Sequence, residues 1–240
     1  MRLLLSIKIQ EIIEKARSED RTFLLEPESK EIMKILEITT TEYQVATDKS
    51  EAKLIARKIG YPVVMKIVSP QVIHKTDAGG VKLNLNSDNE VTAAFDEITR
   101  NARNYNTKAD IRGVLIEKMV KSSTEIIIGV TRDPTFGPAI MFGLGGIFVE
   151  LLKDVSFRIA PITQSDAKEM INEIKALPML QGFRGGPNVD LKNIVETLLK
   201  VSKFTIDYID DILEVDLNPI FAYDDHLLTV DARVILTEKK

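Results

Sequence analysis

Short apolar runs with the composition of β-strands are spread through this chain of 240 residues, and amphipathic segments lie between them. The runs "VVMKIV", "IRGVLIEKMV" and "TEIIIGVTRD" have the lengths and branched residues of strands. Residues 47–62 and 164–177 have apolar side chains at helical spacing. Helices and strands do not alternate regularly, and neither a repeat nor a separating linker is visible in the sequence. The chain is therefore expected to form a mixed α+β structure, as one large domain or as two lobes of one fold.

The composition argues against several classes of function. The formal net charge of −4 and the pI of about 5.4 argue against an electrostatic surface for nucleic acid. Without cysteine, the chain has no disulfide, thiolate nucleophile or zinc–thiolate site. Lys8, Glu11 and Glu14 soon interrupt the apolar N-terminus, which indicates an amphipathic helix instead of a signal peptide. No segment reaches transmembrane length, so we expect a cytoplasmic protein that binds neither nucleic acid nor membrane.

Lys66 suggests a phosphate site, although no standard nucleotide motif is present. The sequence has neither a P-loop nor a Rossmann glycine fingerprint, and the glycines of "GLGG" at 143–146 have the wrong spacing. Lys66 lies inside the apolar run "PVVMKIV", where a lysine needs a partner or a water-filled cleft. Its ammonium suits phosphate oxygens as a point charge. The alternative is that Lys66 lies at a strand end and extends its charge into solvent.

The stretch "LIEKMV" at 115–120 is a second feature that fits a nucleotide. Its extended backbone can offer hydrogen bonds to an adenine ring, while Met119 and Val120 pack on the base. Glu117 or Glu125 can accept a hydrogen bond from an amine or a ribose hydroxyl. Together with Lys118, these residues form the predicted nucleotide site. The alternative is an ordinary half-exposed strand, in which charged and apolar residues also alternate.

Oxygen ligands near the C-terminus indicate a magnesium site. Asp216 and Asn218 in "EVDLNP" lie on one face of a strand because side chains repeat every two residues. Asp231 ends the next predicted strand, and a hairpin with an Asp-Asp turn can bring it opposite them. Hard oxygen ligands of this kind suit Mg²⁺, which bridges nucleotide phosphates. The alternative is that these residues only cap turns beside Pro219.

The order of these features resembles the ATP-grasp fold, in which two α+β lobes hold ATP between them. A closer resemblance, to the β subunits of ADP-forming acyl-CoA synthetases, rests on "SPQVIHKTDAGGVKLNL", "MFGLGGIFVELLKDVSFRIAPIT", "MLQGFRGGP" and "EVDLNP". It covers nearly the whole chain from about residue 22. The resemblance implies an N-terminal helix at 1–21, an N-terminal lobe at 22–115 and a C-terminal lobe with metal-binding strands at 116–240.

The resemblance also gives a role to His74, which lies on a loop just before a glycine pair. In the family, phosphate passes from an acyl phosphate to a histidine of the α subunit and then to ADP, and the loop histidine is implicated as a second carrier. Neutral imidazole is a competent nucleophile near pH 7, and Gly79 and Gly80 can serve as the hinge of the loop. The alternatives are a solvent-facing histidine or a phosphate ligand that is never phosphorylated. The second histidine, His226, is interpreted as an ordinary surface residue.

The resemblance implies an enzyme, an acetate–CoA ligase (ADP-forming), which converts acyl-CoA, ADP and phosphate into a carboxylate, CoA and ATP. ATP and ADP are then substrates, and Mg²⁺ is held by Asn218 and Asp231 with Asp216 close by. Because the sequence has no CoA-binding Rossmann unit, the resemblance implies a separate α subunit that carries this unit and a phosphohistidine, in an α2β2 heterotetramer. Two other functions remain open: a self-contained ATP-grasp carboxylate ligase that forms an acyl phosphate, and a non-catalytic nucleotide-binding regulatory subunit.

Overall fold

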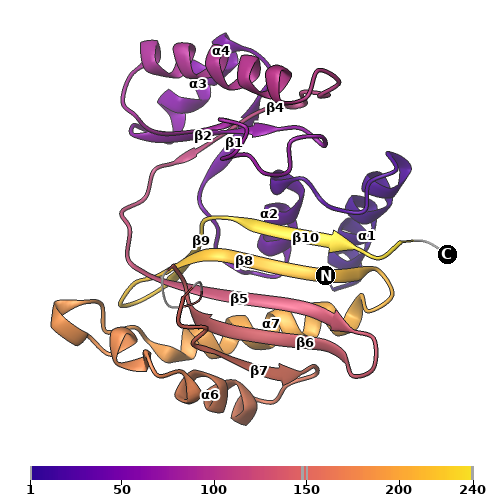
Figure 1. Ribbon diagram of the computed structural model, residues 1–240, viewed down its shortest axis with the longest axis vertical. Helices are drawn as coiled ribbons and strands as arrows, with labels where there is room; N and C mark the ends of the chain where they lie inside the picture. Colours follow the sequence, from indigo (N-terminus) through magenta and orange to yellow (C-terminus); the bar gives the residue numbers. More distant parts are fainter. Residues whose placement is uncertain (1, 147–148, 150, 239–240) are drawn as a thin grey trace. The chain divides into compact units, whose positions relative to one another are not determined.

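The computed structural model describes residues 2–146, 149 and 151–238, and the chain forms two compact units (Figure 1). Unit 1 combines Met1–Thr40 with Ser122–Lys240. Unit 2 is the segment Thr41–Lys121, which is inserted between these two parts. Both units contain helices and antiparallel strands, so the predicted α+β class is confirmed.

The predicted boundaries at 21/22 and 115/116 differ from this division. The first differs because the chain after residue 21 bonds to the last strand of unit 1, where the Leu24 N–H donates to the Val234 carbonyl at 2.9 Å. The second differs because strand β4 (Gly113–Lys118) stays paired with its neighbours in unit 2 as far as Lys118. Pairing between distant segments therefore decides where each unit ends.

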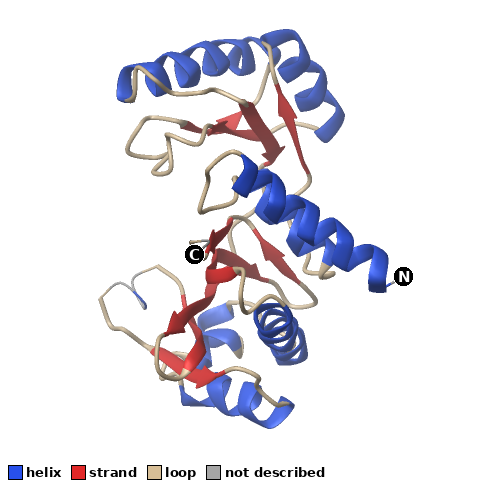
Figure 2. Ribbon diagram, turned by 90° about the vertical axis from the view of Figure 1, so that its right-hand side faces the viewer, coloured by secondary structure: helices blue, strands red, loops and turns tan. Residues whose placement is uncertain are grey.

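Unit 2 is a four-stranded antiparallel sheet, in the order β1-β4-β2-β3, with two helices on one side (Figure 2). Helix α3 begins at Asp48, whose carboxylate accepts from the N–H groups of Ser50 and Glu51 at 2.7 and 2.9 Å. It ends at Gly60, where φ is +88°. In chain order the elements are β1 (Tyr43–Ala46), α3 (Lys49–Ile59), β2 (Val63–Val68), β3 (Val81–Leu85), α4 (Asp88–Tyr105) and β4 (Gly113–Lys118).

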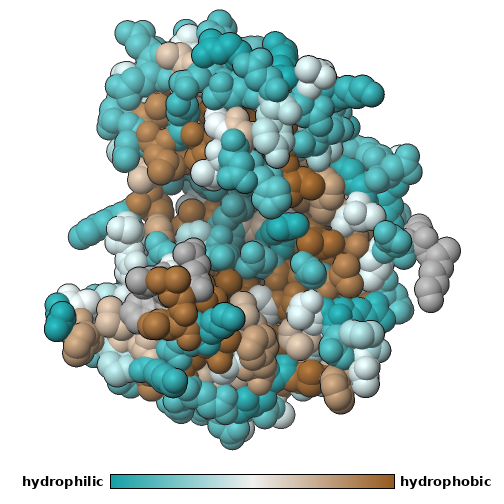
Figure 3. Space-filling model, viewed as in Figure 1, coloured by the Kyte–Doolittle hydropathy of each residue, from teal (hydrophilic) through white to brown (hydrophobic). Residues whose placement is uncertain are grey.

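The two faces of the unit 2 sheet differ. Met65 and Ile67 of β2 pack into a core with apolar residues of α3 and α4. The surface over these helices is mainly hydrophilic in Figure 3, as expected for amphipathic helices on a core. Because successive side chains of a strand point to opposite faces, Lys66 lies on the sheet face that α3 and α4 do not cover.

Unit 1 is built on a six-stranded antiparallel sheet in the order β10-β8-β5-β6-β7, with β9 paired to β8. The short strand β9 and the edge strand β10 lie one after the other along the same side of β8. In chain order the elements are α1 (Arg2–Ser18), α2 (Glu26–Ile35), β5 (Thr124–Asp133), β6 (Gly137–Leu144), β7 (Val155–Ile159), α6 (Gln164–Glu173), two short 3₁₀ helices (Leu177–Leu180 and Phe183–Gly185), α7 (Leu191–Asp207), β8 (Ile212–Ala222), β9 (Leu227–Thr229) and β10 (Ala232–Leu236).

One face of the unit 1 sheet makes the larger core. Ile128, Phe142 and Leu217 from three adjacent strands pack there with apolar residues of α2, α6 and α7. Residues that alternate with them lie on the opposite face, which we call the polar face because β8 places Asp216 on it. Phe157, Met141, Gly129, Asp216 and Arg233 are directly opposed in successive strand pairs, so they form one row across this face.

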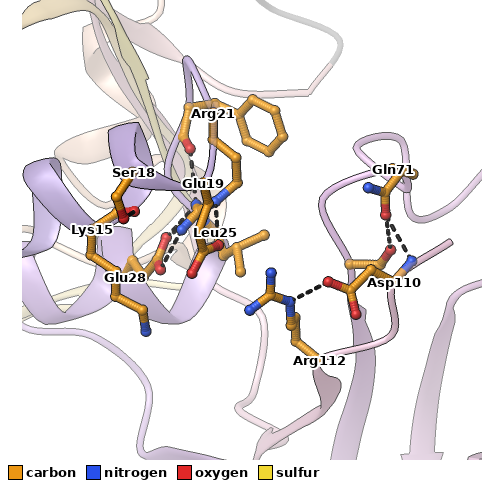
Figure 4. Close-up of polar contacts among 11 residues, drawn as sticks. Lys15, Ser18, Glu19, Arg21, Leu25, Glu28, Gln71, Asp110 and Arg112 are labelled. Atoms are coloured by element: carbon orange, nitrogen blue, oxygen red, sulfur yellow. Dashed lines mark hydrogen bonds and ion pairs between the residues drawn. The ribbon is translucent and has the colours of Figure 1, made fainter.

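The free edge of β10 is covered by the chain between α1 and α2. Leu236 donates its N–H to the Thr22 carbonyl at 2.7 Å, beside the bond from Leu24. Arg21 fixes this segment through two bonds to the Glu28 carboxylate, at 2.7 and 2.8 Å (Figure 4). β10 is therefore held by backbone bonds on both sides.

Candidate functional site

The predicted carrier His74 lies on the loop between β2 and β3 of unit 2, and its side chain is exposed. The loop is closed by its own backbone, since the N–H of Gly80 donates to the Lys75 carbonyl at 2.7 Å and that of Ala78 donates to the His74 carbonyl at 3.2 Å. The Gly80 carbonyl in turn accepts from the Ile67 N–H at 2.8 Å, which fastens the loop to β2. His74 is thus presented to solvent from a tightly bonded turn.

Both glycines of this loop have a structural requirement. Gly79 has a φ of +61°, a left-handed conformation that favours glycine. At Gly80, an added Cβ would lie 2.6 Å from the Ile67 side chain and 3.0 Å from the Lys75 carbonyl oxygen. Close packing therefore requires glycine at position 80, while the hinge function of both residues stays a prediction.

Lys66 and Glu117 form an ion pair on the sheet face of unit 2 that α3 and α4 leave uncovered. Their Nζ and Oε1 atoms are 2.7 Å apart, and their side chains are only 9% and 1% exposed. The Thr41 hydroxyl donates to the other Glu117 oxygen at 2.7 Å. A compact ammonium held in place by a carboxylate suits phosphate oxygens as a point charge. The structure therefore brings two predicted nucleotide residues together, in strands that are paired but distant in sequence.

The end of β4 is already engaged with its own unit. The Lys118 ammonium donates to the carbonyls of Gly60 and Tyr61 at 2.7 and 3.1 Å, at the end of α3. The Met119 N–H donates to the Pro62 carbonyl at 3.1 Å. An adenine ring in this position would consequently rely on other polar groups of the 117–120 stretch, with the half-buried Met119 and Val120 side chains as apolar contacts.

In unit 1, Asn218 and Asp231 are brought alongside each other by the pairing of β8 with β9 and β10. The Val230 N–H donates to the Pro219 carbonyl at 3.0 Å, and Ala232 lies opposite Leu217. Asp231, which lies between Val230 and Ala232, is therefore level with Asn218. The predicted Asp-Asp turn is confirmed, but the single strand expected after it is in fact two strands, and Asp231 occupies the break between them.

Asp216 completes a polar cluster on the same face. Burial raises the pKa of the Asp216 carboxyl above its ordinary value, and the Asp231 carboxylate raises it further, while Arg233 acts in the opposite direction. Carboxylates close enough to repel each other favour a cation between them. Across the described ranges, no group of three or more histidine, cysteine or acidic side chains can hold a metal ion by itself. Two carboxylates and an amide oxygen do fit Mg²⁺ when nucleotide phosphates and water complete its coordination.

Glu125 lies beside the glycine-rich stretch of unit 1, whereas the other predicted nucleotide residues belong to unit 2. Its carbonyl accepts from the Gly145 N–H at 2.8 Å, and a Cβ at Gly145 would lie 3.0 Å from the Glu125 Cβ. Glycine at 145 thus allows the β5 carboxylate and this backbone to approach closely.

Two residues of these clusters were missed by the sequence interpretation. Thr41 gave no signal, because its contact with Glu117 depends on the fold of β4. Arg233 lies two residues after Asp231, and the two-residue period of a strand could have placed it on the same face.

The chain carries an ATP-grasp domain, because a family model with that description matches residues 15–236. It is also similar to the acetate–CoA ligase [ADP-forming] I subunit beta of Pyrococcus furiosus, with 55% identity over 95% of this chain and 98% of that subunit. The chain therefore belongs to the family of ADP-forming acetate–CoA ligase β subunits.

Solved structures of an acetyl-coenzyme A synthetase from Candidatus Korarchaeum cryptofilum have the same fold. One, in complex with coenzyme A and Ca-AMPCP, has 45% identity and a TM-score of 0.91 over 95% of this chain and 99% of that chain. Another, with coenzyme A and Mg-AMPPCP, has 43% identity and a TM-score of 0.84 over 95% and 100% of the two chains. Its phosphohistidine segment is described as pointing towards the nucleotide binding site.

In the described part of the present chain, no helix is long and apolar enough to cross a membrane.

The Lys66–Glu117 pair gives a first prediction. Lys66→Met should lower the free energy of unfolding by about 3–5 kcal/mol, because it leaves a buried carboxylate without its cation. Adding Glu117→Gln should restore part of this loss, since the uncompensated charge is removed. Urea denaturation of both variants measures the two effects.

Lys82→Met is the matched control, because Lys82 and Glu97 also pair at 2.7 Å in unit 2 but with side chains 34% and 41% exposed. Lys82→Met should change the stability little. Equal losses of unfolding free energy in Lys66→Met and Lys82→Met would show that the buried ion pair stabilises the fold no more than the exposed one.

Proposed function

We propose that this chain is the nucleotide-binding β subunit of a heteromeric ADP-forming acetate–CoA ligase in the cytoplasm, where nucleotides and coenzyme A are available. The complex converts acetyl-CoA, ADP and phosphate into acetate, CoA and ATP. The observation that carries the proposal is the 55% identity to a named β subunit along nearly the full length of both chains. A β subunit implies an α subunit, to which we assign the CoA-binding domain and a phosphohistidine, in an α2β2 assembly.

The nucleotide site is proposed to include Lys66, the stretch 117–120 and Glu125. Lys66 contacts phosphate oxygens, and its pairing with Glu117 keeps the ammonium in place before the nucleotide arrives. Met119 and Val120 pack on the adenine base, next to Lys118 at the end of β4. Glu125 accepts a hydrogen bond from the ribose or the base.

Mg²⁺ is proposed to lie at Asn218 and Asp231, with Asp216 in contact with the ion or with a water bound to it. When bound, Mg²⁺ neutralises phosphate charge and orients the phosphate chain. The fold positions the two proposed ligands, because the backbone register of β8 with β9 and β10 holds Asn218 and Asp231 level. The proximity of Asp216 and Asp231 supports a cation site, because their mutual repulsion is relieved by a positive ion.

His74 is proposed to carry the phosphoryl group between the α subunit and ADP. Its exposure on a loop supports this role, because a carrier must reach a group on another chain. Lys75 offsets the charge of the phosphorylated loop, and Asp77 orients the imidazole. Gly79 and Gly80 provide the hinge in this proposal, at the fastened end of the loop.

The test of the proposed function is ATP formation by the assembled complex. The chain is combined with a candidate α subunit, acetyl-CoA, ADP, phosphate and Mg²⁺, and ATP is measured by a coupled luminescence assay. ATP should form only when both chains and all four small molecules are present. ATP-dependent ligation of a carboxylate by this chain alone would instead support a self-contained ligase.

The magnesium site gives a second prediction. Asp231→Ala should weaken Mg-ADP binding to the complex by about tenfold or more, since a direct ligand is lost, while binding of adenosine is unchanged. Titration calorimetry with and without Mg²⁺ measures both. Asp207→Ala, which removes an exposed carboxylate paired with Lys203, is the control. Unaltered Mg-ADP affinity in Asp231→Ala would remove this residue from the site.

The carrier role gives a third prediction. His74→Ala should abolish ATP formation by the complex, because the phosphoryl group then has no acceptor on this chain. Mg-ADP affinity should stay the same, and so should the labelling of the α subunit by acetyl-CoA and radioactive phosphate. His226→Ala removes the other histidine of the chain and should retain activity. Wild-type ATP formation by His74→Ala would show that phosphate passes directly from the α subunit to ADP.

A further inference from the structure

Arg233 occupies a fixed position in the polar cluster of unit 1. It lies on β10 directly opposite Asp216 of β8, two residues after Asp231. The outer edge of β10 is bonded to the segment that contains Thr22 and Leu24, so the backbone at Arg233 is restrained on both sides. Its Cα is therefore held about 7 Å from that of Asp231, the length of two residues in a strand.

The guanidinium of Arg233 is exposed and makes no hydrogen bond or ion pair within the described residues. Other arginines of unit 1 are engaged, for example Arg17 with Asp211 and Arg158 with Glu173. Even Asp216, in the opposed position, is not within ion-pair distance of Arg233. Five N–H donors are thus available for a ligand on the polar face.

The carboxylates around Arg233 leave a negative charge that its guanidinium can offset. Glu214 and Asp216 lie two residues apart on β8, and Asp231 lies level with Asn218 beside them, so three carboxylates occupy neighbouring positions. A Mg²⁺ ion offsets two of these charges, so the phosphates of ADP or ATP would still meet an excess of negative charge. Arg233 is the positive side chain that the two strands place there, and a guanidinium matches phosphate oxygens with a two-pronged geometry.

We propose that Arg233 is a catalytic residue that binds the non-bridging oxygens of the phosphoryl group during its transfer to ADP, an inference that rests on the proposed function. In this step a β-phosphate oxygen of ADP attacks phosphorus and forms a P–O bond. The P–N bond of the phosphohistidine breaks, and the imidazole nitrogen takes a proton from solvent, which leaves ATP and neutral histidine. Charge on the equatorial oxygens is held by preorganised donors in such transfers, and Arg233 supplies them.

The position of Arg233 also predicts which nucleotide it distinguishes. The transferred group becomes the terminal phosphate of ATP, which ADP lacks. Arg233 therefore contributes to binding of ATP and to the transfer itself, and contributes little to binding of ADP. Lysine at this position keeps the charge but loses the two-pronged contact, so it should restore only part of the function.

The experiment compares assembled complexes of wild type, Arg233→Gln and Arg233→Lys. For Arg233→Gln we expect kcat for ATP formation to fall about 100-fold, in the range of a lost transition-state donor. We expect the affinity for a Mg-bound, non-hydrolysable ATP analogue to fall about tenfold, while that for Mg-ADP and the KM for ADP change less than about twofold. Arg233→Lys should lie between the two, and thermal melting should be the same for all three.

Arg103→Gln, an exposed arginine on α4 of unit 2, is the control and should retain wild-type kinetics. An unchanged kcat in Arg233→Gln overturns the proposal, and so does an equal loss of ADP and ATP-analogue affinity, which would place Arg233 at the phosphates of ADP. A lower melting temperature in Arg233→Gln together with wild-type kcat per folded complex would assign it a structural role. If the wild-type complex forms no ATP at all, it is the proposed function that fails, and the analogue affinities still test Arg233.

Discussion

The candidate magnesium site depends on the pairing of β8 with the strands on either side of it. Towards β5, Ile126 lies opposite Ile220 and Ile128 lies opposite Leu217, so β8 has one more residue in this interval than β5. Towards the other side, β9 ends and β10 begins at the same level. Asn218 thus lies in the interval where the pairing with β5 shifts, and opposite the residues between β9 and β10, where the register continues unchanged. The register of β8 with β9 and β10 sets Asn218 level with Asp231. The extra residue of β8 relative to β5 falls at the same point, and a bulge commonly redirects a side chain next to a site.

Short-range patterns in the sequence predicted much of this arrangement. The two-residue period of a strand correctly predicted that Asp216 lies on the sheet face opposite to that of its buried neighbours Val215 and Leu217. Helix α3 lies within residues 47–62, where helical spacing predicted it. The strand β1, by contrast, was not predicted, because the four residues "YQVA" are short and half-buried, and their partner in β4 lies about 70 residues further along. The break between β9 and β10 was missed for the same reason, since it is defined only by pairing with β8.

The site residues show the same limit more clearly. Lys66 was recognised as an unusual buried lysine, but its partner Glu117 was assigned a separate role in recognising the nucleotide, because the sequence does not show that β2 and β4 are neighbours. The glycine pair after His74 was interpreted as a hinge, which stays a prediction, and the sequence did not show that Gly80 also packs closely against Ile67. Composition and period identify unusual residues, and tertiary pairing decides what each of them contacts.

The two bonds from Lys118 to the end of α3 link strand and helix through a single side chain. The carbonyls at the C-terminal end of a helix have no partner within it, and the ammonium bonds to those of the capping residue Gly60 and of Tyr61, directly after α3. A ligand that attracts this ammonium to a phosphate would leave these carbonyls to water and loosen the final turn of α3. Occupancy at the end of β4 and fraying of α3 are therefore thermodynamically linked, and amide hydrogen exchange in that turn becomes a remote reporter of ligand binding.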